Sequence, residues 1–137
     1  MATDLADEMK PVWPSELIPA EHFLFMRVHR VDIDDDGEPF PRAFRNQPKE
    51  SAAMSTDWEQ YASASETRRR GPKAPEEYVI VKFTAGAASS IPGQMVNHDP
   101  LFDNRAHTLV FGEKNGTEVR ERFMQIYTIE IPLLPFP

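Results

Sequence analysis

An arginine and a histidine share one face of an otherwise apolar strand near the start of the chain. In residues 23–31 apolar side chains alternate with Arg27 and His29, and alternate residues of a strand point to opposite sides. A histidine supplies acid–base chemistry near neutral pH, and an arginine holds phosphate or carboxylate through paired hydrogen bonds. We therefore take Arg27 as a candidate substrate-binding residue and His29 as a candidate catalytic residue. The alternative is that both side chains face solvent on a half-covered sheet.

Residues 97–107 form the densest polar cluster of the chain and include two histidines and two aspartates. Imidazole and carboxylate groups together suit zinc or iron. The spacing matches no metal motif, however, and we assign no metal and no cofactor. The same residues could hold a loop together through hydrogen bonds to the backbone and an Arg–Asp pair. As candidate substrate-binding residues we select His98, Asp99, Asn104 and Arg105.

The acidic stretch of residues 32–37 fits the D-x-D-x-D-G opening of an EF-hand calcium loop. The twelfth loop position, which should supply a bidentate glutamate, is Ala43, and Pro39 and Pro41 lie inside the loop. A strand rather than a helix is expected to enter it. These departures favour a solvated acidic hairpin turn over a calcium site.

The sequence contains no motif for an activated nucleophile or a phosphate-binding loop. It has no G-x-S-x-G, no Gly-rich phosphate loop and no H-E-x-x-H. The run Arg68–Arg70 could contact phosphate, but in an acidic chain it is more typical of the solvated end of a helix. Any enzymatic activity would therefore depend on dispersed residues, and the sequence leaves open whether the protein is an enzyme.

The patterns that would position these residues are short strands and helices. Strands are predicted over residues 23–31, 78–84, 107–111 and 125–131, helices over 54–61, 65–70 and 117–124, and a turn or short helix near 87–91. The helix at 54–61 depends on a capping-box pattern, Thr56 followed by Glu59. The order predicts a small α+β domain with a mixed or antiparallel sheet, two or three short helices and proline-rich loops. We place this domain at residues 21–131, between an N-terminal arm (1–20) and a C-terminal tail (132–137).

Composition narrows the class of partner. The 137 residues carry a net charge of −7, which disfavours binding to nucleic acid and to anionic membranes. No apolar stretch approaches the roughly 20 residues of a membrane span. The absence of cysteine excludes disulfides and a thiol nucleophile. The acidic N-terminus differs from a signal peptide, so we expect a cytoplasmic protein with no nucleic-acid and no membrane partner.

Several short segments between residues 22 and 125 are similar to a recurring family of small prokaryotic proteins. The resemblance implies a prokaryotic origin and implies no activity, because the family is uncharacterised. The segments that carry it are Arg27–His29, Gly37–Phe40, Ala43–Asn46, Met54–Trp58, His98–Pro100 and Asn104–His107.

A second resemblance is to ADP-ribosyltransferase-like folds, which place Arg or His on an early strand, a Ser-Thr pair on a later strand and Glu near a third. Two features depart from that layout: the Ser-Thr pair is predicted at the start of a helix, and no Glu-x-Glu pair is present. The residues that follow the order are Arg27 or His29, then Ser55 and Thr56, then Glu113 or Glu130.

We therefore expect a small protein that binds or acts on a phosphate-bearing small molecule, a nucleotide or an NAD-like compound. Arg27 and Arg105 would hold the anion and His29 would transfer protons, with Asp99 or Asn104 orienting them. The alternative is a non-catalytic interaction module, an accessory or neutralising protein whose acidic surface and proline-rich ends bind a protein partner. An enzyme should present a concave polar pocket with converging titratable groups, whereas a module should present an exposed apolar or acidic patch.

Overall fold

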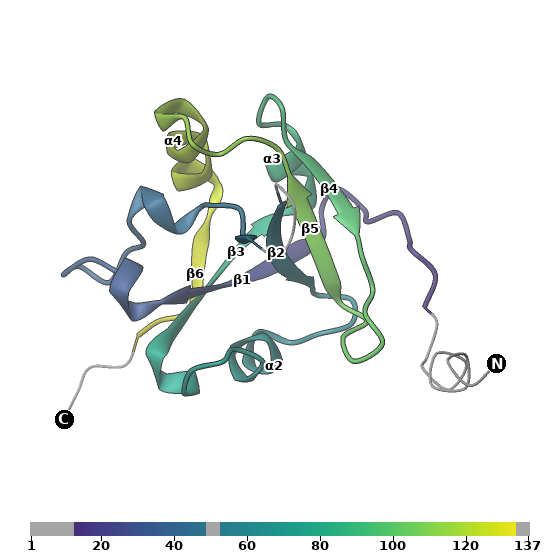
Figure 1. Ribbon diagram of the computed structural model, residues 1–137, viewed down its shortest axis with the longest axis horizontal. Helices are drawn as coiled ribbons and strands as arrows, with labels where there is room; N and C mark the ends of the chain where they lie inside the picture. Colours follow the sequence, from purple (N-terminus) through teal and green to yellow (C-terminus); the bar gives the residue numbers. More distant parts are fainter. Residues whose placement is uncertain (1–12, 49–52, 134–137) are drawn as a thin grey trace.

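The computed structural model describes residues 13–48 and 53–133 (Figure 1). Within these ranges the strands form one antiparallel sheet of six strands in the order β4-β5-β2-β1-β3-β6. Residues 1–12 of the predicted arm and 134–137 of the predicted tail lie outside the described residues. The strands are β1 (Phe23–His29), β2 (Ala53–Trp58), β3 (Tyr78–Thr84), β4 (Met95–His98), β5 (His107–Phe111) and β6 (Thr128–Ile131).

The helices lie on both faces of this sheet. Figure 1 shows α2 on one side and α3 and α4 on the other. The prediction of a small α+β fold with an antiparallel sheet and short helices is thus confirmed. No helix in the described ranges is long and apolar enough to cross a membrane. The α-helices are α2 (Ala64–Arg69), α3 (Ala85–Ser89) and α4 (Thr117–Ile126), and the short 3₁₀ helices are η1 (Arg30–Asp32), η2 (Pro41–Ala43) and η4 (Pro75–Glu77).

The hydrophobic core fills the face covered by α3 and α4. The predicted apolar stripe of β1 enters it, since Leu24, Met26 and Val28 are almost fully buried. From α4, Phe123 stacks on Phe44 with ring centroids 5.3 Å apart. The alternation of β1 therefore directs Arg27 and His29 to the opposite face, which α2 covers in part.

The prediction of a helix at residues 54–61 is wrong. Residues 53–58 form β2, which pairs with β1 on one side and β5 on the other. Pairing on both edges outweighs the local capping pattern, because a strand in mid-sheet buries side chains on both faces. The capping box lies later, where Ser63 Oγ accepts from the backbone N–H of Glu66 and Glu66 Oε1 accepts from that of Ser63.

Like β2, the strand β4 was not among the predicted strands. Its residues Met95 and Asn97 are exposed, and it lies at the edge of the sheet beside β5. A polar edge strand lacks the alternating apolar pattern that identifies a half-buried one, which is why residues 95–98 resembled a loop. The predicted helix at 117–124 forms as α4, which follows Gly116 without a side-chain cap.

The acidic stretch forms a hairpin turn, as the sequence favoured. Asp34 Oδ1 accepts hydrogen bonds from the backbone N–H groups of Asp36 and Glu38, and Gly37 adopts φ +83°. Asp32 points elsewhere and accepts from the guanidinium groups of Arg42 and Arg45, each at 2.9 Å. Burial opposes the ionisation of Asp32, but these two arginines outweigh it and lower the pKa of its carboxyl group.

A buried lysine, Lys114, follows β5 and bonds backbone carbonyl groups at the end of this strand. The side chain of Lys114 is 1% exposed, and its Nζ donates to Asn46 Oδ1 and to the carbonyl groups of Val110 and Gly112. Burial lowers the pKa of Lys114 to about 8, and the charge of Glu113 acts in the opposite direction. The ammonium group is thus held by neutral acceptors inside the fold.

Replacing Phe123 with alanine tests the core. The side chain is fully buried and also meets the edge of Phe83, so its removal leaves a cavity between α4 and the sheet. We expect Phe123→Ala to lower the free energy of unfolding by about 3–5 kcal/mol in urea titrations. Glu121→Ala, an exposed position on the same helix, should change it by no more than about 0.5 kcal/mol. Equal effects of the two changes would contradict this account of the core.

The titration of Lys114 should be visible in the pH dependence of stability. Because its pKa is lowered on folding from 10.5 to about 8, the unfolded chain holds more protons than the folded chain between these values. The contribution of Lys114 to stability is therefore lowest below pH 8 and rises up to about pH 10.5. We expect the free energy of unfolding of the wild type, relative to that of Lys114→Met, to increase as the pH rises from about 8 to 10.5. The exposed control Lys73→Met should give a flat difference.

Candidate functional site

The strands β1 and β2 separate halfway along their length. β1 pairs with β3 over seven residues but with β2 only at Leu24–Trp58 and Phe25–Asp57. Beyond Phe25 the two strands border a hollow of about 290 Å³, which is lined by residues from both faces of β1 and β2. Residues of the segment between β1 and β2 also line it, among them Asp32, Arg45 and Gln47.

A second hollow of about 350 Å³ lies beside the first, between α2 and the turn that joins β4 to β5. Three residues line both hollows, namely Arg27, Ser55 and Asp57. We call the two hollows together the groove. The residues common to both hollows lie near α2, which packs against β1.

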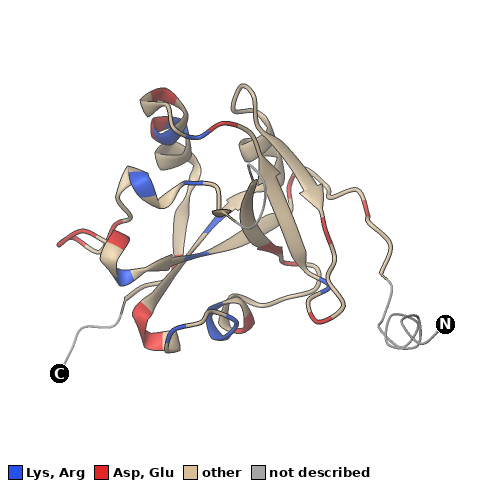
Figure 2. Ribbon diagram, viewed as in Figure 1, with Lys and Arg blue, Asp and Glu red and all other residues tan. Residues whose placement is uncertain are grey.

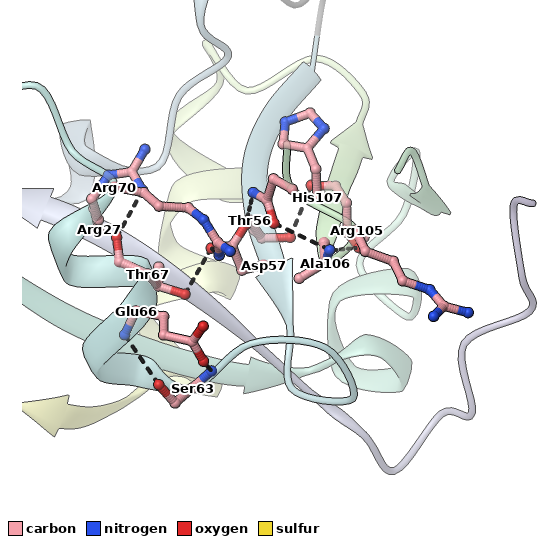
Figure 3. Close-up of polar contacts among 12 residues, drawn as sticks. Arg27, Thr56, Asp57, Ser63, Glu66, Thr67, Arg70, Arg105, Ala106 and His107 are labelled. Atoms are coloured by element: carbon pink, nitrogen blue, oxygen red, sulfur yellow. Dashed lines mark hydrogen bonds and ion pairs between the residues drawn. The ribbon is translucent and has the colours of Figure 1, made fainter. Parts of the chain in front are cut away.

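The walls of the groove are tied to β2 by the carboxylate of Asp57, which is 3% exposed. Oδ2 accepts from Thr67 Oγ1 at 2.7 Å and from Arg70 Nη1 at 3.2 Å, both from the α2 region. Oδ1 accepts from Asn104 Nδ2 at 2.9 Å, in the turn before β5. Figure 3 shows Thr67 and Arg70 pointing towards Asp57 from one side. A single buried carboxylate therefore fixes both walls.

A hydrogen-bonded chain of serine, histidine and aspartate lies on the floor of the groove. Ser55 Oγ lies 2.8 Å from His107 Nε2. His107 Nδ1 lies 3.1 Å from Asp99 Oδ2 and 3.0 Å from the Asp99 carbonyl oxygen. Both atoms facing Nδ1 are acceptors, which assigns the imidazole proton to Nδ1. Nε2 is then an acceptor, and the Ser55 hydroxyl donates to it.

Arg27 is a cation of this face that forms no ion pair within the part of the chain that the structure describes. Figure 2 shows few charged residues in the strands compared with the helices and loops. Of the charged strand residues, Lys82 pairs with Glu130 and Asp57 pairs with Arg70. Arg27 Nη1 donates to the carbonyl oxygen of Thr67 at 2.9 Å, and among the described residues the guanidinium has no carboxylate partner. The remaining donors of this half-buried group are available to an anion in the groove.

The structure places the predicted site residues on different faces. Arg27 and Asn104 line the groove, and Asp99 supports His107. His29 lines the hollow between β1 and β2, where its Nε2 lies 3.1 Å from Glu77 Oε1.

His98 and Arg105 lie away from the groove. The alternation of β4 buries His98, whose Nδ1 accepts from the Glu16 backbone N–H while Nε2 donates to the Arg105 carbonyl oxygen. The Arg105 guanidinium stacks between Trp13 and Tyr61, 4.4 and 4.0 Å from the ring centroids. Figure 3 shows it pointing away from Arg27. The expected clamp of Arg27 with Arg105 is therefore not formed, and the arginine that shares the second hollow with Arg27 is Arg70.

Several residues that line the groove were not among the predicted site residues; they include Ser55, Asp57, Thr67, Arg70 and His107. Ser55 and Asp57 lie on β2 and not at a helix start, and they alternate with Met54, Thr56 and Trp58, of which Met54 and Trp58 are apolar. This period-2 pattern was the available signal. The pairing of Arg70 with Asp57 had no signal in the sequence, because it depends on where α2 docks.

The ADP-ribosyltransferase-like layout is only partly assembled. Ser55 and Thr56 do lie on a strand beside β1, which removes one departure from it. The glutamates do not follow: Glu130 is on β6 and pairs with Lys82, and Glu113 lies in the loop after β5. Neither lines the groove.

No family model, no curated protein and no solved structure matches this chain. The fold defines it as a small α+β protein with one antiparallel sheet. The function must therefore be inferred from the groove and its residues.

Loss of the Asp57 carboxylate should loosen both walls. Asp57→Ala leaves three donors without their acceptor in a buried setting, and we expect a loss of about 3 kcal/mol in the free energy of unfolding. Amide hydrogen exchange should increase in α2 and in residues 101–104 more than in β3. Asp35→Ala, in the exposed part of the acidic turn, is the matched control and should leave both measurements unchanged. Protection that is unaltered in α2 would contradict the role of Asp57.

Proposed function

We propose that the protein binds a small phosphate-bearing molecule, a nucleotide or an NAD-like compound, in the groove. The observation that carries this proposal is the guanidinium of Arg27 at the junction of the two hollows, which bonds the Thr67 carbonyl oxygen but has no carboxylate partner among the described residues. A partly desolvated arginine without a carboxylate partner favours an anion, and its planar fork matches two phosphate oxygens.

The surroundings of Arg27 suit a molecule with an anionic part and an organic part. On one side the hollow between β1 and β2 contains apolar surface from Phe25, Met26, Val28 and Tyr78. On the other side Arg70 and Asn104 add donors from the second hollow. The negative charge of Asp57 is already matched by Arg70 and by two neutral donors, which reduces its repulsion of a bound anion.

The shape of the site supports a small-molecule ligand more than a protein partner. The groove is concave, its hollows are of the size of small-ligand pockets, and titratable side chains converge on it. An interaction module was expected to present an exposed apolar or acidic patch instead. Binding of a protein partner is the alternative, and it is favoured if no small phosphate compound changes Tm.

Thermal denaturation with AMP, NAD and pyrophosphate tests the proposal. A ligand at about 100 times its dissociation constant should stabilise the fold by roughly 2.7 kcal/mol, which raises Tm by several degrees. We expect Arg27→Ala to abolish this increase and Arg27→Lys to restore part of it, since lysine supplies charge without the planar fork. Arg69→Ala is the control, because Arg69 is exposed, lines neither hollow and donates to Ser65 Oγ on its own helix.

Two results would contradict the proposal. If none of the three compounds changes Tm, or if Arg27→Ala responds like wild type, the groove is not a phosphate site. A search for a protein partner would then follow.

A further inference from the structure

We propose that Ser55 is a nucleophile, activated by His107 and oriented through Asp99, and that the protein transfers the phosphoryl group of a small phosphate ester to Ser55 and then to water. The inference rests on the proposed function, because it takes the phosphate held at Arg27 as the reacting group. Beyond binding, it assigns a reaction to the groove and a catalytic role to Ser55.

The hydrogen bonds around His107 carry the inference. The imidazole is almost fully buried, and its Nδ1 faces two acceptors of Asp99, the carboxylate and the carbonyl oxygen. The backbone N–H of Asp99 donates to the carbonyl oxygen of His107 at 2.9 Å, so the two residues are fixed to each other in both directions. The ring is thus held with a basic Nε2 aimed at Ser55 Oγ, which is the arrangement that general-base activation of a hydroxyl requires.

The position of Ser55 also suits a nucleophile. Its side chain is half-buried and lines both hollows, as does that of Arg27. Its backbone N–H donates to Gln47 Oε1 at 2.6 Å, which holds this part of β2 in place where β1 has moved away. The serine therefore borders the same space as Arg27, in which the phosphate is proposed to bind, and Arg70 lines the second hollow as well.

The reaction balances with water as the only co-reactant. Ser55 Oγ attacks phosphorus, its proton passes to His107 Nε2, and the bond from phosphorus to the ester oxygen breaks. The leaving alcohol takes the proton from His107. Water then gives a proton to His107 and its oxygen to phosphorus, the Oγ–P bond breaks, and Ser55 regains its proton. The products are the alcohol and inorganic phosphate, with Arg27 and Arg70 stabilising the charge on the phosphoryl oxygens.

Asp99 acts as a positioning residue. Its carboxylate keeps the imidazole proton on Nδ1, and replacing it with an amide offers a donor at the same place. Asp99→Asn should therefore favour the wrong tautomer and slow the reaction of Ser55, without a change in Tm or in phosphate binding.

A fluorophosphonate probe tests the nucleophile separately from binding, because the probe is uncharged and does not need Arg27. Intact-mass and peptide analysis should find one adduct, on Ser55. Ser55→Ala should lose it, and His107→Gln should slow its formation by about 100-fold or more. The control Ser65→Ala, on the exposed side of α2, should react like wild type. Tm and the pyrophosphate-induced rise in Tm verify that each variant is folded with an intact groove.

Hydrolysis of p-nitrophenyl phosphate completes the test. Release of p-nitrophenol that is lost in both Ser55→Ala and Arg27→Ala supports phosphoryl transfer. No adduct on Ser55, with the Arg27-dependent binding of pyrophosphate retained, overturns the inference and leaves the proposed function standing. An adduct on Ser55 without any Arg27-dependent binding overturns the proposed function and, with it, the phosphate substrate.

Discussion

The carboxylate of Asp57 is the group on which the groove depends. It lies almost fully buried on β2 and accepts hydrogen bonds from Thr67, Arg70 and Asn104. These donors come from two segments that are far apart in the sequence, the α2 region and the turn before β5. A buried carboxylate is costly unless its oxygens are matched by donors, so docking of both segments is coupled to its burial. The α2 region and the turn before β5 are thus both held to β2 by the same carboxylate.

The separation of β1 from β2 is the second constraint. A continuous ladder would have placed Arg27 against Ser55 across a closed sheet, with no space between them. Because the pairing ends at Phe25 and Asp57, a hollow remains between the strands, and residues from 32–47 line part of it. Arg27 then borders that hollow, and within residues 13–48 and 53–133 its guanidinium bonds the Thr67 carbonyl oxygen and no carboxylate. The separation of β1 from β2 thus creates the hollow and places the guanidinium of Arg27 beside it.

Much of the fold was predictable because its signals are local. The strands at residues 78–84 and 107–111 have the expected bounds, and the alternation of β1 correctly identified its buried face. The helix end at Arg68–Arg70 was also near the observed end of α2. β2 was missed because a capping pattern is a local preference, whereas its two neighbouring strands come from elsewhere in the chain. Of the candidate site, Arg27 was placed correctly on the polar face of β1, but its expected partner Arg105 stacks between two aromatic rings elsewhere.

The sequence by itself determined the class of fold, the buried face of β1 and the turn at Asp34–Gly37, since these follow from side-chain alternation and from the chemistry of turn residues. Only the tertiary structure decided which polar residues meet. Ser55, His107 and Asp99 come from β2, from β5 and from the segment joining β4 to β5, and their hydrogen bonds exist because antiparallel pairing sets the register of Asp57 against His107. Register is a property of pairs of strands, and no single segment of the sequence contains it.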